Sequence, residues 1–198
     1  MRKNVVNSFF LIFLAAQLAI GGLAQNHRID REHSSLTIHV GRAGLFSVAG
    51  HEHWVRAPFS DGSFSAKDPA HVTFSIDAKS LTVVPDKDLS SEKQAEVQNT
   101  MQSQVLESQK YPEVTFRSTR IDRLQPDHWT VIGDLTLHGQ TRSIRVDVKS
   151  ADGTYTGNAK FKQTNFGIEP VSVGGVVKVK DELEIAFTVV AEKNVDGP

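Results

Sequence analysis

The residues best suited to chemistry in this chain are two histidines, His51 and His53, in the segment Gly50-His51-Glu52-His53-Trp54. In an extended strand, residues two apart face the same way, so the pair has the spacing to bind one metal ion. A zinc site needs a third and usually a fourth ligand. The available histidines are His39, His71 and His138, and no spacing joins any of them to the pair.

The orientation expected for this pair argues against a metal site. The two histidines alternate with an apolar set that we expect to point inward, namely Phe46, Val48 and Trp54. Unless a bulge at Gly50 changes the register, the histidines face outward and Glu52 faces inward. The pattern favours a surface or hydrogen-bonded structural role, and it leaves a metal or polar-headgroup role as the alternative.

Other catalytic patterns are missing from the sequence. The chain has no cysteine, which excludes thiol catalysis, and it has no Gly-x-Ser-x-Gly nucleophile elbow. Asp134 and Glu52 belong to no paired-carboxylate pattern, so we expect a protein that is not an enzyme. Several basic residues are either solvated strand residues or contacts for a pyrophosphate headgroup at a barrel mouth: Arg42, Arg56, Arg117, Arg142 and Lys178.

The elements that must position these residues are mostly strands. Period-2 alternation of apolar and polar residues, closed by turn residues, marks half-buried antiparallel strands. About eight such segments occur, at residues 36–40, 45–55, 72–76, 114–118, 129–138, 142–148, 155–161 and 183–189. A single antiparallel sheet of this size usually closes on itself, which removes its exposed edges. The sequence therefore predicts an all-β, mainly antiparallel barrel.

One interruption differs from the strands. Residues 88–109 show no alternation and contain many good helix formers. Ser91 with Gln94 fits a capping box, and Val97, Met101 and Val105 recur at a spacing of four. We expect one or two short amphipathic helices across a barrel end or flank, as a lid or wall of a binding site.

The N-terminus has the layout of a secretory signal peptide, with two basic residues, an apolar run and small residues before a cleavage site after Ala24. We expect residues 1–24 to be removed, leaving one domain at 25–198 in the periplasm or outside the cell with no membrane span. Removal of the peptide takes away two of the 22 basic residues. The remaining 20 basic and 23 acidic residues give a net charge near −3. This balance argues against a nucleic-acid partner. The oligomeric state stays open, a homodimer included.

An ordered set of motifs resembles the YceI-like family of bacterial exported proteins. Asp30, His33 and Ser34 precede the first long strand, and Lys110-Tyr111-Pro112 closes the insert. The later motifs are Val114-Thr115-Phe116-Arg117-Ser118, Gly133-Asp134-Leu135-Thr136-Leu137-His138-Gly139 and Asn165-Phe166-Gly167-Ile168. The resemblance spans nearly all of residues 25–198. It implies an extended, lipocalin-like barrel that holds a polyisoprenoid in its interior, with no known enzymatic activity and no cofactor beyond that lipid.

Such a ligand needs a long apolar lining, since it is bound chiefly by removing apolar surface from water. The candidates come from the inward face of the predicted strands: Ile38, Phe74, Ile76, Phe116, Trp129, Val131, Phe161 and Phe187. The alternative is that these residues pack a dry core. A second function also stays open, in which His51 and His53 serve a metal-binding or redox-linked accessory protein. His138 stands beside a turn glycine, so we expect a hairpin residue there and not a ligand.

Overall fold

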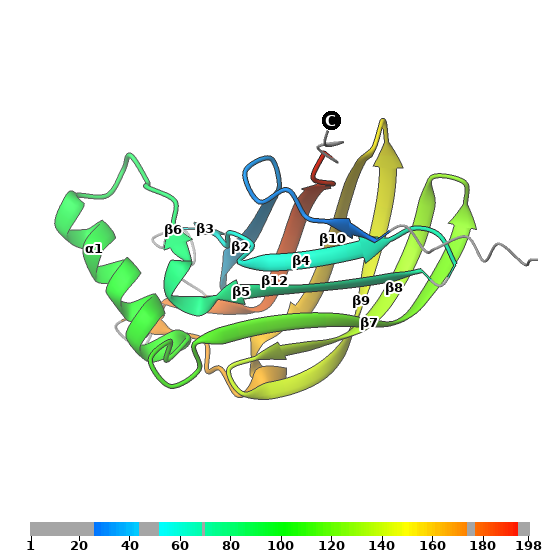
Figure 1. The fold of residues 1–198 in the computed structure, drawn as a ribbon. Coiled ribbons are helices and arrows are strands. Elements are labelled where there is room, and N and C mark those ends of the chain that lie inside the picture. Colours follow the sequence, from blue (N-terminus) through cyan, green and yellow to red (C-terminus); the bar gives the residue numbers. More distant parts are fainter. Residues whose placement is uncertain (1–25, 44–51, 69, 174–176, 194–198) are drawn as a thin grey trace, which may run out of the picture.

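The computed structural model describes residues 26–43, 52–68, 70–173 and 177–193. These residues form one curled, twelve-stranded antiparallel sheet with a short helical insert at one end (Figure 1). The strands are β1 (His27–Arg28), β2 (Ser35–Ala43), β3 (His53–Arg56), β4 (Asp61–Ser65), β5 (His71–Asp77), β6 (Thr82–Val83), β7 (Glu113–Gln125), β8 (His128–Leu137), β9 (Gln140–Ala151), β10 (Thr154–Lys162), β11 (Ser172–Val173) and β12 (Val177–Val190). The helical segments are η2 (Ala78–Ser80), α1 (Ser91–Thr100), η3 (Met101–Val105) and η4 (Gln163–Phe166).

The order of strands in the sheet is β1-β4-β5-β7-β8-β9-β10-β12-β2-β3-β6, with β11 paired to β12. The sheet curls far enough for its first strand to meet β12. Ile29, just after β1, forms a bridge with Ala191, and the Asp30 N–H donates to the Val190 carbonyl at 2.9 Å. This seam joins the two sides of the curled sheet, so the predicted antiparallel, barrel-like architecture is confirmed.

The Asp30-His33-Ser34 motif holds this seam. The Asp30 carboxylate accepts the backbone N–H groups of Glu32 and His33 at 3.0 and 3.1 Å, and the His33 Nδ1 atom lies 2.8 Å from Asp30 Oδ2. The Ser34 hydroxyl accepts the Val190 N–H at 3.0 Å. The motif thus has a structural role, which is to shape the turn that brings the start of the barrel against β12.

We expect Asp30→Asn to weaken the dependence of stability on acidic pH. Burial of the Asp30 carboxylate raises its pKa, but the hydrogen bonds from the His33 ring and from two backbone N–H groups outweigh burial and lower the pKa overall. A lowered pKa means that the carboxylate stabilises the fold above its unfolded pKa of about 4, and that this contribution disappears as the pH falls through the folded-state pKa. Urea unfolding between pH 2 and pH 6 measures this slope. A variant with an unchanged acid slope would contradict the assignment.

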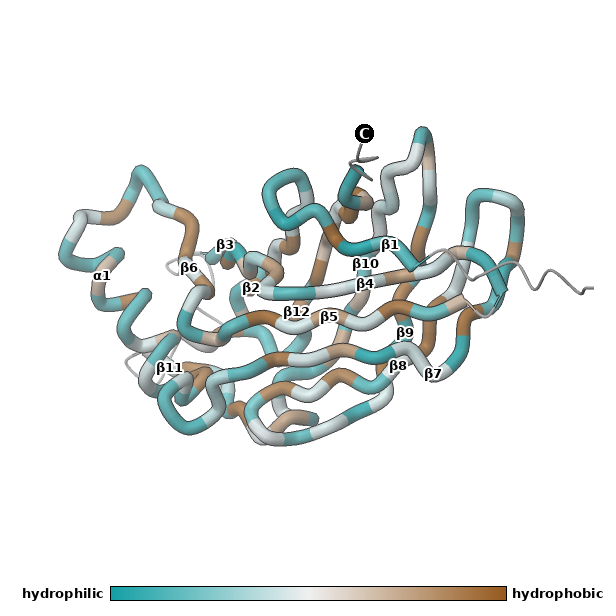
Figure 2. The backbone as a smooth tube through the Cα atoms, viewed as in Figure 1, coloured by the Kyte–Doolittle hydropathy of each residue, from teal (hydrophilic) through white to brown (hydrophobic). Residues whose placement is uncertain are grey.

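Hydrophobic residues alternate along the long strands, as brown and teal positions in Figure 2, and the apolar set lines the inside of the curl. The two-residue turn between β8 and β9 supports this register. His138 and Gly139 have φ values of 51° and 71°, as a tight hairpin turn requires, and Leu137 pairs with Gln140 across it. The hairpin predicted at this glycine is confirmed.

The prediction of about eight strands missed four short ones, β1, β4, β6 and β11. Strand β4 carries only one large apolar residue, Phe64, between small ones, so its alternation is weak. Gly62 in this strand leaves space that a neighbouring side chain fills, since a Cβ atom there would lie 2.5 Å from Ile29 Cδ1. In the segment predicted at 45–55, the part up to His51 lies outside the described residues, and β3 occupies the rest.

The insert begins one residue earlier than the capping box predicted. Ser90 is the N-cap, and its hydroxyl accepts the Lys93 N–H at 3.3 Å. The Gln94 side chain instead donates to the carbonyls of Asp86 and Leu89, both at 3.0 Å. These two bonds tie the loop before α1 to its first turn, so Gln94 takes no part in a capping box with Ser91. The π-helical segment η3 continues α1 directly, and Figure 1 shows both at one end of the sheet.

Candidate ligand-binding cavity

The curled sheet encloses a cavity of about 1000 Å³. This volume is at the upper end of the roughly 300–1,000 Å³ range of ligand pockets. Its walls are the inward-facing side chains of β2, β5, β7, β8, β9, β10 and β12, and most of them are hydrophobic. The interior is therefore large and apolar, and it is not filled by side chains.

All eight lining candidates from the sequence lie on the cavity wall. They come from six strands: Ile38 of β2, Phe74 and Ile76 of β5, Phe116 of β7, Trp129 and Val131 of β8, Phe161 of β10, and Phe187 of β12. Their contact with a ligand stays a prediction. Sequence reasoning left out other wall residues that share the same alternation, among them Leu135, Val146 and Ile185. Phe59 and Leu81 also line the wall, but they come from irregular segments that carry no periodic signal.

The two ends of the cavity differ in chemistry. At the insert end, Val97, Met101 and Val105 line the wall, as their spacing of four predicted, together with polar and charged side chains. At the other end, the cavity reaches the aromatic residues Phe64, Trp129 and Tyr155. We call these the insert end and the aromatic end.

Glutamine side chains fasten the insert to the edge of the sheet. The Gln98 amide accepts the Val83 N–H at 2.8 Å and donates to the Leu81 carbonyl at 3.0 Å. The Gln102 amide donates to the carbonyls of Ala78 and Leu81 at 3.1 and 3.0 Å. These bonds satisfy backbone groups beside the edge strand β6, and no side chain of α1 is fully buried.

Motifs distant in the sequence meet where the insert ends. The His138 Nε2 atom lies 2.7 Å from Glu107 Oε2, and its Nδ1 atom lies 3.3 Å from the Phe166 carbonyl oxygen. The Tyr111 ring is 4.3 Å from the His138 ring, and a Cβ atom on Gly139 would lie 2.7 Å from Tyr111 Cε1. His138 is thus a hairpin residue, as predicted, and it also connects the insert to the barrel.

We expect His138→Asn to lower the free energy of unfolding by about 1–2 kcal/mol, because it removes the hydrogen bond with the Glu107 carboxylate. Asparagine tolerates the positive φ at this position, so the hairpin turn survives the change. Amide exchange across residues 101–106 should accelerate more than exchange in the centre of β8. Equal protection of the insert in the variant and the wild type would show that this contact does not hold it.

The structure corrects the expected orientation at the second histidine. His53 lines the cavity, whereas Trp54 is 48% exposed and its ring stacks on His39 at 4.5 Å. Glu52 also lies on the outer side, with Oε2 3.1 Å from His39 Nε2. In the register of β2 and β3, His53 pairs with Val40, an inward residue, so the inward set continues through His53 and not through Trp54.

The histidines considered as metal ligands are not brought together by the structure. His51 lies outside the described residues, His39 is on the outer face beside Glu52, and His138 is held at the insert contact. His71 lines the cavity on the side of the aromatic end. Across residues 26–43, 52–68, 70–173 and 177–193, no group of three or more His, Asp or Glu side chains is placed to hold a metal ion.

The basic residues considered as headgroup contacts do not lie together either. Arg42 lines the cavity at the insert end, whereas Arg56, Arg117 and Arg142 are exposed. The Lys178 side chain is not among those that the structure describes. A headgroup role stays open at the cavity mouth for Arg42 alone among the described members of the set.

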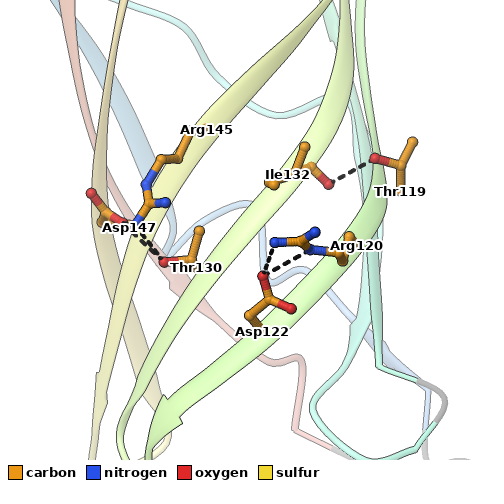
Figure 3. A network of polar contacts seen from close by, with 7 residues as sticks. All are labelled: Thr119, Arg120, Asp122, Thr130, Ile132, Arg145 and Asp147. Carbon is orange, nitrogen blue, oxygen red and sulfur yellow. Dashed lines mark hydrogen bonds and ion pairs between the residues drawn. The ribbon is translucent and has the colours of Figure 1, made fainter.

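The outer face of β7, β8 and β9 is polar and carries its own network (Figure 3). The Arg145 guanidinium donates to the Thr130 hydroxyl at 2.9 Å, and that hydroxyl donates to Asp147 at 3.3 Å. Arg120 pairs with Asp122 two residues along the same strand. Thr130 is 2% exposed, whereas the Arg145–Asp147 and Arg120–Asp122 pairs face solvent. Exposed ion pairs contribute about 0–1 kcal/mol each, so these contacts support the register of the strands, and the candidate site is the interior.

Comparison with known proteins identifies the domain. The model of the YceI-like domain family matches residues 27–191. A UPF0312 protein of Vibrio parahaemolyticus is 28% identical over 151 residues, covering 75% of this chain and 74% of that protein. A UPF0312 protein of Vibrio cholerae is 26% identical over 186 residues, covering 86% of this chain and 93% of that protein.

Solved structures share the fold at lower identity. Burkholderia cenocepacia BcnA superposes with a TM-score of 0.52 at 19% identity, covering 81% of this chain and 98% of that one. A polyisoprenoid binding domain from Saccharophagus degradans, implicated in plant cell wall breakdown, gives a TM-score of 0.55 at 14% identity, covering 82% and 95%. Within the described residues, no helix has the length and apolar character needed to cross a bilayer.

Proposed function

The chain belongs to the YceI-like family, and from this membership and its cavity we propose that it binds a polyisoprenoid or a similar long apolar ligand inside the barrel. The observation that carries the proposal is the apolar interior of about 1000 Å³. The polyisoprenoid binding domain of Saccharophagus degradans, which shares the fold, supports the choice of ligand class.

The chemistry of the wall suits such a ligand. Burial of apolar surface stabilises a complex by roughly 25 cal/mol per Å², before the costs of lost motion are subtracted. A polyisoprenoid is almost wholly apolar, so its affinity comes from contact along the whole wall and not from a few hydrogen bonds. We propose that the protein has no catalytic activity and that it sequesters or transports its ligand.

We also propose where this occurs. Residues 1–24 have the composition of a cleaved signal peptide, so the domain at 25–198 would act in the periplasm or outside the cell. A binding protein there could shield a lipid tail from water between membranes. The N-terminal sequence of protein recovered from a bacterial periplasm tests the cleavage after Ala24.

Native mass spectrometry of protein purified from a bacterial host tests the function. We expect a bound mass that disappears after organic extraction, and a prenyl lipid in the extract. Delipidated protein should then take up an added polyprenol, whereas the same protein unfolded in urea should not. Repeated empty extractions together with no uptake of polyprenol would refute the proposal. The same spectra report whether the protein is a monomer or a dimer.

A further inference from the structure

Three aromatic rings meet across one end of the cavity. The Phe64 and Tyr155 ring centroids are 5.0 Å apart in an edge-to-face contact, and the Trp129 ring is 6.0 Å from Tyr155. These residues belong to β4, β8 and β10. Along the sheet, β4 and β10 are separated by β5, β7, β8 and β9 in one direction, and across the seam by β1 and β12 in the other. The contact between Phe64 and Tyr155 therefore joins the two sides of the seam inside the barrel and is not a contact between neighbouring strands.

Burial and a neighbouring arginine hold the rings in place. Phe64 and Trp129 are 7% and 9% exposed. The Arg123 guanidinium lies over the Trp129 ring, 5.8 Å from its centroid, and donates to the Pro126 carbonyl in the adjacent hairpin at 2.8 Å. Edge-to-face aromatic pairs contribute about 0.5–1.5 kcal/mol beyond their burial. The aromatic end is therefore a packed wall.

Charge is concentrated at the opposite end. Among the described residues that line the cavity, the Arg, Lys, Asp and Glu side chains are Arg42, Lys93 and Glu96, all at the insert end. At the aromatic end the polar lining groups are Ser65, His71 and the Tyr155 hydroxyl, none of them an Arg, Lys, Asp or Glu, and the Ser65 hydroxyl bonds to the backbone of Lys67. An amphiphile is thus bound best with its polar head at the insert and its tail toward the three rings.

We propose that Phe64, Trp129 and Tyr155 form a stop for the ligand's tail and so select its length. This inference rests on the proposed function. Each additional isoprene unit buries more apolar surface until the tail reaches the rings. A longer tail must then separate packed rings or push the polar head out beyond the insert, and either change cancels the gain.

A series of polyprenols that differ only in the number of isoprene units tests the stop. For delipidated wild-type protein, we expect affinity to rise with each unit and then to stop rising at a break. Tyr155→Ala should move the break to longer tails, and at the first length past the wild-type break it should bind about tenfold more tightly than the wild type. Trp129→Leu, as a second variant, should move the break in the same direction.

Two controls isolate the effect of position. Tyr155→Phe keeps the ring and should leave the break unchanged. Met101→Ala also removes apolar wall, but at the insert end, so it should weaken binding at every length without moving the break.

The outcomes separate this inference from the proposed function. No binding of any polyprenol by the wild type would refute the function itself. Binding with the same break in Tyr155→Ala and Trp129→Leu would refute the length stop and leave the function standing. Faster association in both variants with an unmoved break would also overturn the stop, because the rings would then be a gate for entry.

Discussion

Replacing Gly133 by alanine is expected to lower the free energy of unfolding by about 1–3 kcal/mol, the usual cost of overpacking a filled interior. Strand propensity alone predicts the opposite sign, because alanine is better than glycine within a strand by roughly 0.5–1 kcal/mol. Here packing outweighs propensity. A Cβ atom on Gly133 would lie 2.4 Å from Phe116 Cζ and 2.6 Å from the Arg117 carbonyl oxygen. Urea unfolding of delipidated protein measures the change.

A double-mutant cycle with Phe116→Leu identifies the cause. If the Phe116 ring is the obstacle, Gly133→Ala should cost at least about 1 kcal/mol less in the Phe116→Leu background than in the wild type. Equal costs in the two backgrounds would assign the effect to the backbone contact with Arg117. A stabilising Gly133→Ala would show that the interior is looser than these distances indicate.

The packing of an aromatic ring over a glycine occurs twice in the barrel. A Cβ atom on Gly157 would lie 2.4 Å from Phe187 Cζ, as one on Gly133 would from Phe116. In both places an aromatic ring from the adjacent strand lies over the glycine, against the wall. The interior therefore keeps its volume although the lining contains large rings, and the glycines help to leave the space that a ligand requires.

The fold could be predicted from the sequence where one face of a long strand is buried. Strand β8 shows why, because its inward residues from Trp129 to Leu137 alternate without interruption with residues of the outer face. A slip of one residue would move this whole set to the outside. The same alternation therefore predicted both the strands and the residues of the cavity wall.

The sequence did not predict features that depend on contacts between distant segments. The orientation of His53 depends on its pairing with Val40, and extrapolation through Gly50 placed it on the wrong face. The contact between Glu107 and His138 joins residues 31 positions apart, and Phe64 meets Tyr155 across the seam. Periodicity along one strand carries no information about which side chains meet across a cavity.

Replacing Ile185 by aspartate is expected to lower the affinity for a polyprenol by at least about 100-fold. Ile185 lines the middle of the cavity, where β12 pairs with Ile38 of β2 and Ala159 of β10. A bound tail would strip water from the new carboxylate, which costs several kcal/mol in an apolar site, and every 1.4 kcal/mol is a factor of ten in affinity. Without ligand, the carboxylate faces open cavity and can stay hydrated, so the fold should survive.

The next residue along β12 supplies the matched control. Ala186 is exposed on the outer face, so Ala186→Asp adds the same charge to the same strand and should bind polyprenol as the wild type does. Ile185→Asn has nearly the shape of the aspartate without its charge, and its affinity should fall between the two because an amide is less costly to desolvate than a carboxylate. Acidification should restore part of the binding by Ile185→Asp as the carboxylate takes up a proton, and it should not affect Ile185→Asn. If Ile185→Asp, folded by circular dichroism, bound polyprenol as tightly as Ala186→Asp, the ligand would have to lie outside the barrel, and an interior site would be excluded.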